Sequence, residues 1–157
     1  MGMIYSVVFS SVAVTAQQDF FEYTAPSDAI AIIHSVELTQ STDVGDIAAE
    51  GLAILHKRGA TSSGTGGTQT VTPAPLEFGF TAAGGVADIN NTAKASGGTI
   101  VTLHSSNWII QSPYLWLPTP EYRHVLSPSQ RYTVELGTTP ADSITVSGTL
   151  ILEEIGG

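Results

Sequence analysis

Apolar and polar residues alternate at every second position through much of the chain, and this pattern constrains the fold more than any other feature. Successive side chains of a β-strand point to opposite faces, so a period of two predicts strands with one buried and one exposed face. The clearest segments are 30–38, 131–136 and 144–153. Strands with one exposed face are typical of antiparallel sheets.

The alternation also predicts which side chains form the core. One face of segment 30–38 carries Ile30, Ile32, His34, Val36 and Leu38. On this face His34 is expected to be a core histidine bonded to the backbone. The residues that we most expect to be buried are Ile32, Val134, Val146 and Leu150.

The first segment breaks the alternation in its middle. Tyr5, Val7 and Phe9 share one face, whereas Val12 and Val14 fall on the other. A β-bulge near Ser10-Ser11 would return both sets to the same core.

The remaining chain continues the all-β pattern. Further strands are expected at 20–24, 52–58, 99–104 and 107–111, and the eight prolines lie at segment boundaries. One short helical turn is expected at DVGDIAAEG, residues 43–51. The sequence therefore predicts a single antiparallel β-sandwich domain of the jelly-roll type over residues 1–157, with a long Ser/Thr/Gly loop.

Composition and charge exclude several classes of function. The chain contains five Lys and Arg residues and fourteen Asp and Glu residues, for a net charge of −9, and no basic cluster extends beyond Lys57-Arg58. An acidic chain of this kind repels phosphate backbones, so no nucleic-acid partner is expected. No segment approaches the ~20 apolar residues of a membrane span. The absence of cysteine rules out disulfides and thiolate metal sites.

The motifs that carry chemistry are also missing. The tract GATSSGTGG lacks the Gly-Lys-Ser/Thr ending of a phosphate loop, and no Gly-x-Ser-x-Gly elbow is present. The four histidines do not have the spacing of a zinc motif. Glu153 and Glu154 point to opposite faces of a strand and cannot act together. We therefore expect no cofactor, no metal and no enzymatic activity, although paired carboxylates from separate strands leave a hydrolase open.

Two other stretches are candidates for contact with a partner. The polar tract Thr61–Pro75 is longer than a hairpin requires, and such loops are usually functional or disordered. Its deletion over Ser62–Thr68 is expected to leave folding intact. The segment Tyr114–Tyr122 concentrates aromatic residues and prolines, which lose little entropy on binding. Its aromatic rings could instead form a platform on which sugars stack.

Three stretches together resemble a family of small tailed-bacteriophage virion proteins, the capsid cement or decoration proteins. The stretches are STDVGDIAAEGLAILHKRGATSSGTGG, TPEYRHVLSPSQR and the ending SGTLILEEIGG. The resemblance implies a β-sandwich, synthesised in the host cytoplasm, that binds the major capsid protein on the capsid surface of the virion. It also implies a homotrimer and no cofactor.

The resemblance and the residue patterns together give a set of interface candidates. They are Thr65, Thr68, Tyr114, Trp116, Glu121, Tyr122 and Arg123. The alternative is a carbohydrate-binding or receptor-facing β-sandwich module at the collar or tail of the virion.

Overall fold

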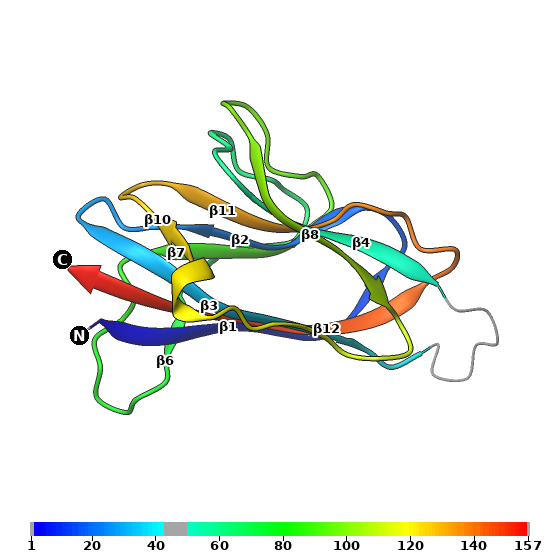
Figure 1. Cartoon of the computed structure of the whole chain (residues 1–157), viewed down its shortest axis with the longest axis horizontal. Coiled ribbons are helices and arrows are strands. Elements are labelled where there is room, and N and C mark those ends of the chain that lie inside the picture. Colours follow the sequence, from blue (N-terminus) through cyan, green and yellow to red (C-terminus); the bar gives the residue numbers. More distant parts are fainter. Residues whose placement is uncertain (1, 43–49, 157) are drawn as a thin grey trace.

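Two antiparallel sheets pack face to face as a β-sandwich in the computed structural model, which describes residues 2–42 and 50–156 (Figure 1). Sheet A contains β1 (Met3–Val14), β3 (Ala29–Gln40), β6 (Ala74–Pro75), β9 (Tyr114–Trp116), β10 (His124–Leu126) and β12 (Ile144–Gly156). Sheet B contains β2 (Gln18–Thr24), β4 (Gly51–Arg58), β5 (Thr68–Val71), β7 (Val86–Asn91), β8 (Val101–Ile109) and β11 (Arg131–Leu136). The predicted all-β sandwich is therefore confirmed.

Short helical structure occurs at a place that the sequence did not indicate. A 3-10 helix, η1 (Pro120–Tyr122), lies between β9 and β10. It starts on a proline, whose fixed φ suits the first helical position. Most of the helical turn predicted at 43–51 lies outside the described residues.

The order of the strands is compatible with a jelly roll. In sheet A, β1 neighbours β12, β12 neighbours β3, and β3 pairs with both β9 and β10. In sheet B the order β2-β11-β4-β8 stands opposite it. The three strands β5, β6 and β7 come from one insertion between β4 and β8, and they extend the two sheets beyond β2 and β1.

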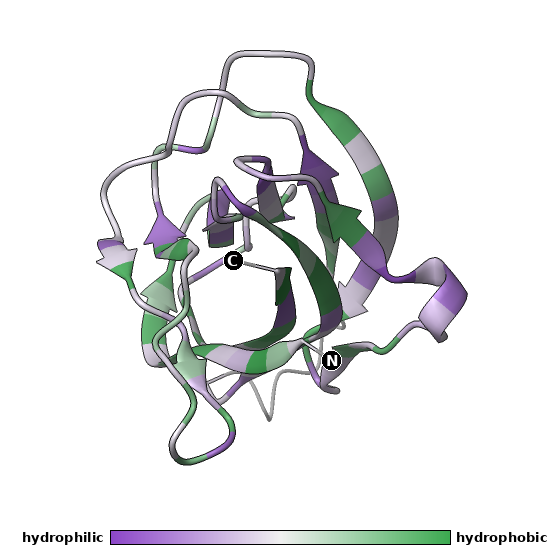
Figure 2. Cartoon of the chain, turned by 90° about the vertical axis from the view of Figure 1, so that its left-hand side faces the viewer, coloured by the Kyte–Doolittle hydropathy of each residue, from purple (hydrophilic) through white to green (hydrophobic). Residues whose placement is uncertain are grey.

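The core lies between the inner faces of the two sheets. Figure 2 looks along the sandwich from the end where both chain termini lie, and the strands surround this interior. Val134, Val146 and Leu150 are fully buried there, as the alternation predicted. The largest buried side chains are Trp108, Tyr5, Tyr23, Tyr132, Phe20 and Phe21.

The predicted bulge in the first strand is present. The pairing of β1 with β12 shifts between Phe9 and Val12, and Ser11 takes a positive φ of 55°. After this shift Val14 is fully buried, on the same core as Val7. The bulge thus directs the apolar residues on both sides of Ser10-Ser11 toward the same core.

The predicted faces of β3 are wrong in its first half. The pairing with β12 shifts so that Ile33 faces Leu152 and Ser35 faces Ile151, which leaves His34 without a register partner. Ala31 and Ile33 are consequently buried, whereas Ile32 is turned outward and is only partly buried.

This bulge also changes the environment of His34. Its Nε2 atom lies 2.9 Å from a carboxylate oxygen of Glu153, and both side chains are 17% exposed. The predicted core histidine bonded to the backbone is therefore wrong.

The Ser/Thr/Gly tract is ordered against its own chain. Ser62 and Thr65 form β-bridges with Ser96 and Ala93, so two parts of the insertion run together on the outer side of sheet B. The glycines allow this close approach: a Cβ at Gly67 would lie 2.0 Å from the Ile89 carbonyl oxygen.

Buried carboxylates hold the tract in place. Glu22, 2% exposed, accepts hydrogen bonds from the backbone N–H of Gly64 at 2.9 Å and from the Asn91 amide at 3.1 Å. Asp19, 1% exposed, accepts one from the Ala95 N–H at 2.7 Å. Deletion of Ser62–Thr68 would remove the Gly64 donor from the buried carboxylate of Glu22, which argues against the expectation that this deletion leaves folding intact.

Candidate interaction surface

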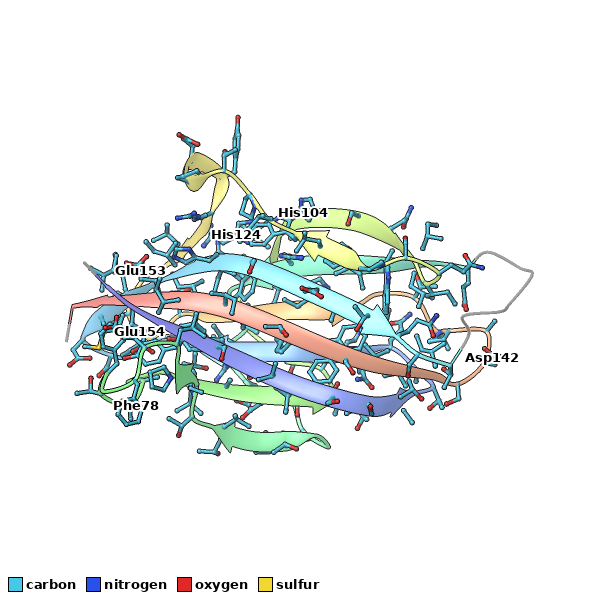
Figure 3. All side chains as sticks on the ribbon, turned by 90° about the horizontal axis from the view of Figure 1, so that it is seen from below. Phe78, His104, His124, Asp142, Glu153 and Glu154 are labelled. Carbon is cyan, nitrogen blue, oxygen red and sulfur yellow. The ribbon has the colours of Figure 1, made fainter. Side chains whose placement is uncertain are left out.

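The segment from β9 to β10 forms a broken edge of sheet A. Both strands pair with β3: Trp116 faces Val36, and Val125 faces Ile32. Between them the chain leaves the sheet through Leu117 and forms η1. In Figure 3, which faces the outer side of sheet A, this yellow segment projects from the edge beside β3.

Four apolar side chains of this segment face solvent. Leu115, Leu117, Tyr122 and Val125 are 59%, 68%, 77% and 58% exposed. We call these four residues the apolar strip. Leu115 lies opposite Glu37 and Val125 opposite Ile32, so the four side chains are spread along the same edge of β3. Single exposed apolar residues are ordinary, but several along one edge mark a place where a partner can bind.

The outer face of sheet A continues the apolar strip. Ile32 lies directly opposite Val125 in the register, so the two side chains share a face. Ile30 lies opposite Ile155 two residues away, and Ile155 is 36% exposed. The bulge at His34 therefore turns two isoleucines toward this surface.

The predicted aromatic candidates are split between the interior and the surface. Tyr114 and Trp116 are 7% and 8% exposed and pack between the sheets, whereas Tyr122 is exposed. Since Trp108 is also buried, these rings do not form a platform on which a sugar could stack.

The two charged candidates lie beside the strip. Glu121 is exposed in η1, and a hydrogen bond from its own backbone N–H lowers its pKa, with a smaller contribution from the Thr119 side chain. The Nε atom of Arg123 is buried and has no hydrogen-bond partner within the described chain. Glu121 therefore helps to hold the turn, whereas the Nε atom of Arg123 is buried and is not accessible to a partner.

Thr65 and Thr68 lie elsewhere. Both side chains are exposed, Thr65 in the bridge to Ala93 and Thr68 at the start of β5. The strand β5 is the outermost strand of sheet B, whereas the apolar strip belongs to sheet A. The structure does not bring these two groups of candidates together.

A cluster of histidines behind the apolar strip was not predicted. The ring of His56 lies 5.2 Å from that of His104 and 5.7 Å from that of His124, measured between centroids. Trp116 packs 4.8 Å from His56 and 4.6 Å from His124. Figure 3 shows His104 and His124 close together at this edge.

Burial lowers the pKa of two histidines of this cluster. Desolvation, followed by the nearby His104 and His124, lowers the pKa of His56 to about 2. Desolvation and His104 lower the pKa of His124 to about 4. Burial likewise raises the pKa of Tyr132 well above its ordinary value. His56 and His124 are thus uncharged at neutral pH.

Other candidate chemistry is dispersed. Glu153 binds His34, whereas Glu154 accepts hydrogen bonds from the Tyr23 hydroxyl and the Gly85 N–H, so the two carboxylates occupy opposite faces as predicted. Across residues 2–42 and 50–156, no group of three or more His, Asp or Glu side chains is arranged to hold a metal ion. The same residues contain no helix long and apolar enough to cross a membrane.

The chain matches no described protein family, and a search of curated proteins finds no similar sequence.

Proposed function

We propose that this chain is a structural virion protein that cements or decorates the head of a tailed bacteriophage. The main observation behind the proposal is the apolar strip at the edge of sheet A. Its four exposed apolar side chains lie within the eleven-residue segment 115–125. The resemblance of three sequence stretches to such proteins supplies the kind of partner. The proposal assigns no catalytic step to the chain.

The strip has the physical properties of a docking segment. Full burial of a large apolar side chain contributes about 1.5–3 kcal/mol, so several together can sustain a stable contact. Pro118 and Pro120 restrict the backbone between Leu117 and Tyr122, which lowers the entropy lost on binding. The interruption between β9 and β10 also leaves fewer unpaired backbone groups than a continuous edge strand would, so a partner is expected to bind through side chains rather than by adding a strand.

The partner that we assign to the strip is the major capsid protein, on the outer surface of the virion. Acidic copies of this chain repel one another at a net charge of −9, which favours a different protein as the occupant of the strip. The homotrimer stays a prediction, with Thr65 and Thr68 as candidates for a contact outside the strip.

The proposal is tested with a double substitution in the strip. Leu117→Ser with Tyr122→Ser removes two side chains that are 68% and 77% exposed, so the circular dichroism spectrum should not change. Co-sedimentation with heads that lack this protein should show affinity at least about tenfold lower than that of the parent.

The matched control is Phe78→Ser. Phe78 is fully exposed at 106% on the loop between β6 and β7, away from the strip (Figure 3). This variant should bind as the parent does. If the double variant decorates heads as well as the parent, or if Phe78→Ser loses binding equally, the strip is not the contact.

A further inference from the structure

The edge segment, residues 114–126, meets sheet B through aromatic rings. Its two strands, β9 and β10, contain three residues each and pair with no strand but β3 in the described part of the chain. Their inward side chains Trp116 and His124 pack on each other with ring centroids 4.6 Å apart. The ring of His56 on β4 lies 4.8 Å from the first of these rings and 5.7 Å from the second. Two imidazoles thus lie in the contact between the edge segment and sheet B.

The inward rings and the outward apolar side chains alternate along the same two strands. In β9, Leu115 is exposed and Trp116 is buried. In β10, His124 faces the interior and Val125 is exposed. Since successive side chains of a strand point to opposite faces, the inner contacts fix the position of the apolar strip. A change that displaces Trp116 or His124 therefore also displaces the strip.

The groups that face His124 from the neighbouring strands carry no negative charge. His104 of β8 lies 5.2 Å from His56 between ring centroids, and Figure 3 shows it close to His124. Tyr132 of β11 lies 5.7 Å from His124, whose register partner on β3 is Ile33. Across residues 2–42 and 50–156, none of the three clustered histidines forms an ion pair with a carboxylate. A proton on this cluster would therefore have no negative partner.

The charged residues that precede His124 in the chain do not supply one. Arg123 is a cation, so it repels a second positive charge beside it. Glu121 is exposed in η1 and interacts with Arg123, its own backbone N–H and the Thr119 side chain. A protonated His124 would thus have a like charge next to it and two further imidazoles behind it.

Hydrogen bonding also favours the neutral form of His124. Its Nδ1 atom is buried and has no hydrogen-bond partner within the described residues. A neutral imidazole can leave Nδ1 without a proton, whereas an imidazolium carries a proton on both nitrogens. A proton at Nδ1 would then be a buried donor without an acceptor, which is unfavourable. Burial and the nearby His104 accordingly lower the pKa of His124 to about 4.

We propose that the histidine cluster is an acid-sensitive switch, in which protonation of His124 releases the edge segment, and with it the apolar strip, from sheet B. Once released, His124 is in water and binds a proton near its ordinary pKa of 6.5. The released state therefore binds more protons than the packed state, and it gains population as the pH falls from 6.5 toward 4. The long pairing of β12 with β3 does not have to open for this.

Hydrogen exchange of the free protein at pH 7 and pH 5 tests the switch. Each measured rate is compared with the rate of an unstructured peptide at the same pH, which gives a protection factor. Protection of the amides in the edge segment should fall about tenfold, a value reduced to allow for partial exposure of His124. Protection of β12 should change by less than about twofold. An equal loss in both, or no loss in the edge segment, would overturn the proposal.

Two histidine substitutions test which group binds the proton. His124→Gln has no titrating ring, so the loss of protection between pH 7 and pH 5 should shrink to less than about threefold. His104→Gln keeps His124 but removes a ring that contributes to its lowered pKa, so the loss should be smaller than in the parent. A loss as large as the parent's in both variants would contradict the proposal.

The matched control is Glu121→Gln, which removes a carboxylate from the same segment. The pKa of Glu121 lies below its ordinary value, so this side chain stays ionised from pH 7 to pH 5. The variant should therefore lose protection as the parent does, and a constant protection factor would assign the switch to Glu121 instead. Regulation of head binding by this switch rests on the proposed function, whereas the exchange experiment contains no heads and tests the switch alone.

Discussion

His56 joins the two sheets by a hydrogen bond to Tyr114: its Nε2 atom on β4 lies 3.0 Å from the tyrosine hydroxyl on β9. Its Nδ1 atom lies 2.5 Å from the hydroxyl of Tyr132 on β11. A neutral imidazole has one donor and one acceptor, so one of the two hydroxyls accepts a hydrogen bond from His56 and the other donates one. Burial, which lowers the pKa of His56 to about 2, keeps this connection between the sheets uncharged.

The free energy of unfolding should decrease in acid because His56 and His124 are buried in their neutral form. The pKa of His124 is about 4 in the folded chain against an ordinary value of 6.5, so the unfolded state binds more protons between these values. The contribution of His124 is complete above pH 6.5 and is lost as the pH falls toward 4. His56 acts in the same direction, from pH 6.5 to about 2.

Substitution of His124 measures this contribution. We expect the stability difference between the parent and His124→Gln to shrink by about 1–2 kcal/mol between pH 6.5 and 4, a value reduced to allow for partial exposure. Urea unfolding at each pH gives the measurement. Val8→Ala, at a position that is 56% exposed and carries no titrating group, is the control and should retain the parent's profile. A constant difference between His124→Gln and the parent across this range would contradict the burial of a neutral imidazole.

Asp19 should have the opposite pH dependence. Its pKa is raised to about 7, mainly by burial, so the folded state binds more protons between pH 4 and 7 and its contribution is lost as the pH rises. Asp19→Asn keeps an oxygen for the Ala95 N–H and removes the buried charge. The variant should therefore gain stability relative to the parent from pH 5 to pH 8 in urea unfolding. If the stability of Asp19→Asn relative to the parent instead increased as the pH fell, Asp19 would be ionised in the folded protein at little cost.

Glu22 should be required for the order of the Ser/Thr/Gly tract. Glu22→Gln leaves Arg131 without its ionic partner and provides one acceptor oxygen in place of two, so we expect a loss of about 3 kcal/mol. Hydrogen exchange at the Gly64 amide should accelerate with it. Glu121→Gln, at the surface of η1, is the control and should change neither quantity. Unchanged protection of Gly64 would mean that the bridges to residues 93–96 hold the tract without Glu22.

Leu150 tests the core itself. Its side chain is fully buried on β12, and Leu150→Ala should cost about 2–5 kcal/mol in urea unfolding. Val8→Ala is the matched control because Val8, on the neighbouring strand, is 56% exposed. Its cost should stay within about 0.5 kcal/mol. Equal losses in both variants would contradict the assigned inner and outer faces.

The strands were predictable because burial imposes a period of two, but the two bulges differ in how visible they are. In β1 the apolar residues change phase at Ser10-Ser11, so the bulge can be inferred from the sequence. In β3 the run Ile30-Ala31-Ile32-Ile33 is apolar at every position and is compatible with either face. Only the register with β12 decides that Ile33 is buried and Ile32 is not.

The ion pairs of Glu135 with Lys57 and Lys94 and the histidine cluster depend on strand order, which alternation does not determine. Lys57 is separated from Lys94 and Arg131 by long stretches of chain, and its neighbours are set by the pairing of β4 with β11. His56, His104 and His124 likewise come from β4, β8 and β10. Spacing along the sequence therefore could not reveal either group.

The stoichiometry of this chain in purified phage particles tests the central proposal most directly. Quantitative mass spectrometry of intact heads would give its number of copies relative to the major capsid protein. A cement or decoration protein should be present in a fixed ratio to the capsid protein, and Leu117→Ser with Tyr122→Ser should reduce that ratio while Phe78→Ser leaves it unchanged. Absence of the chain from purified heads would contradict the account.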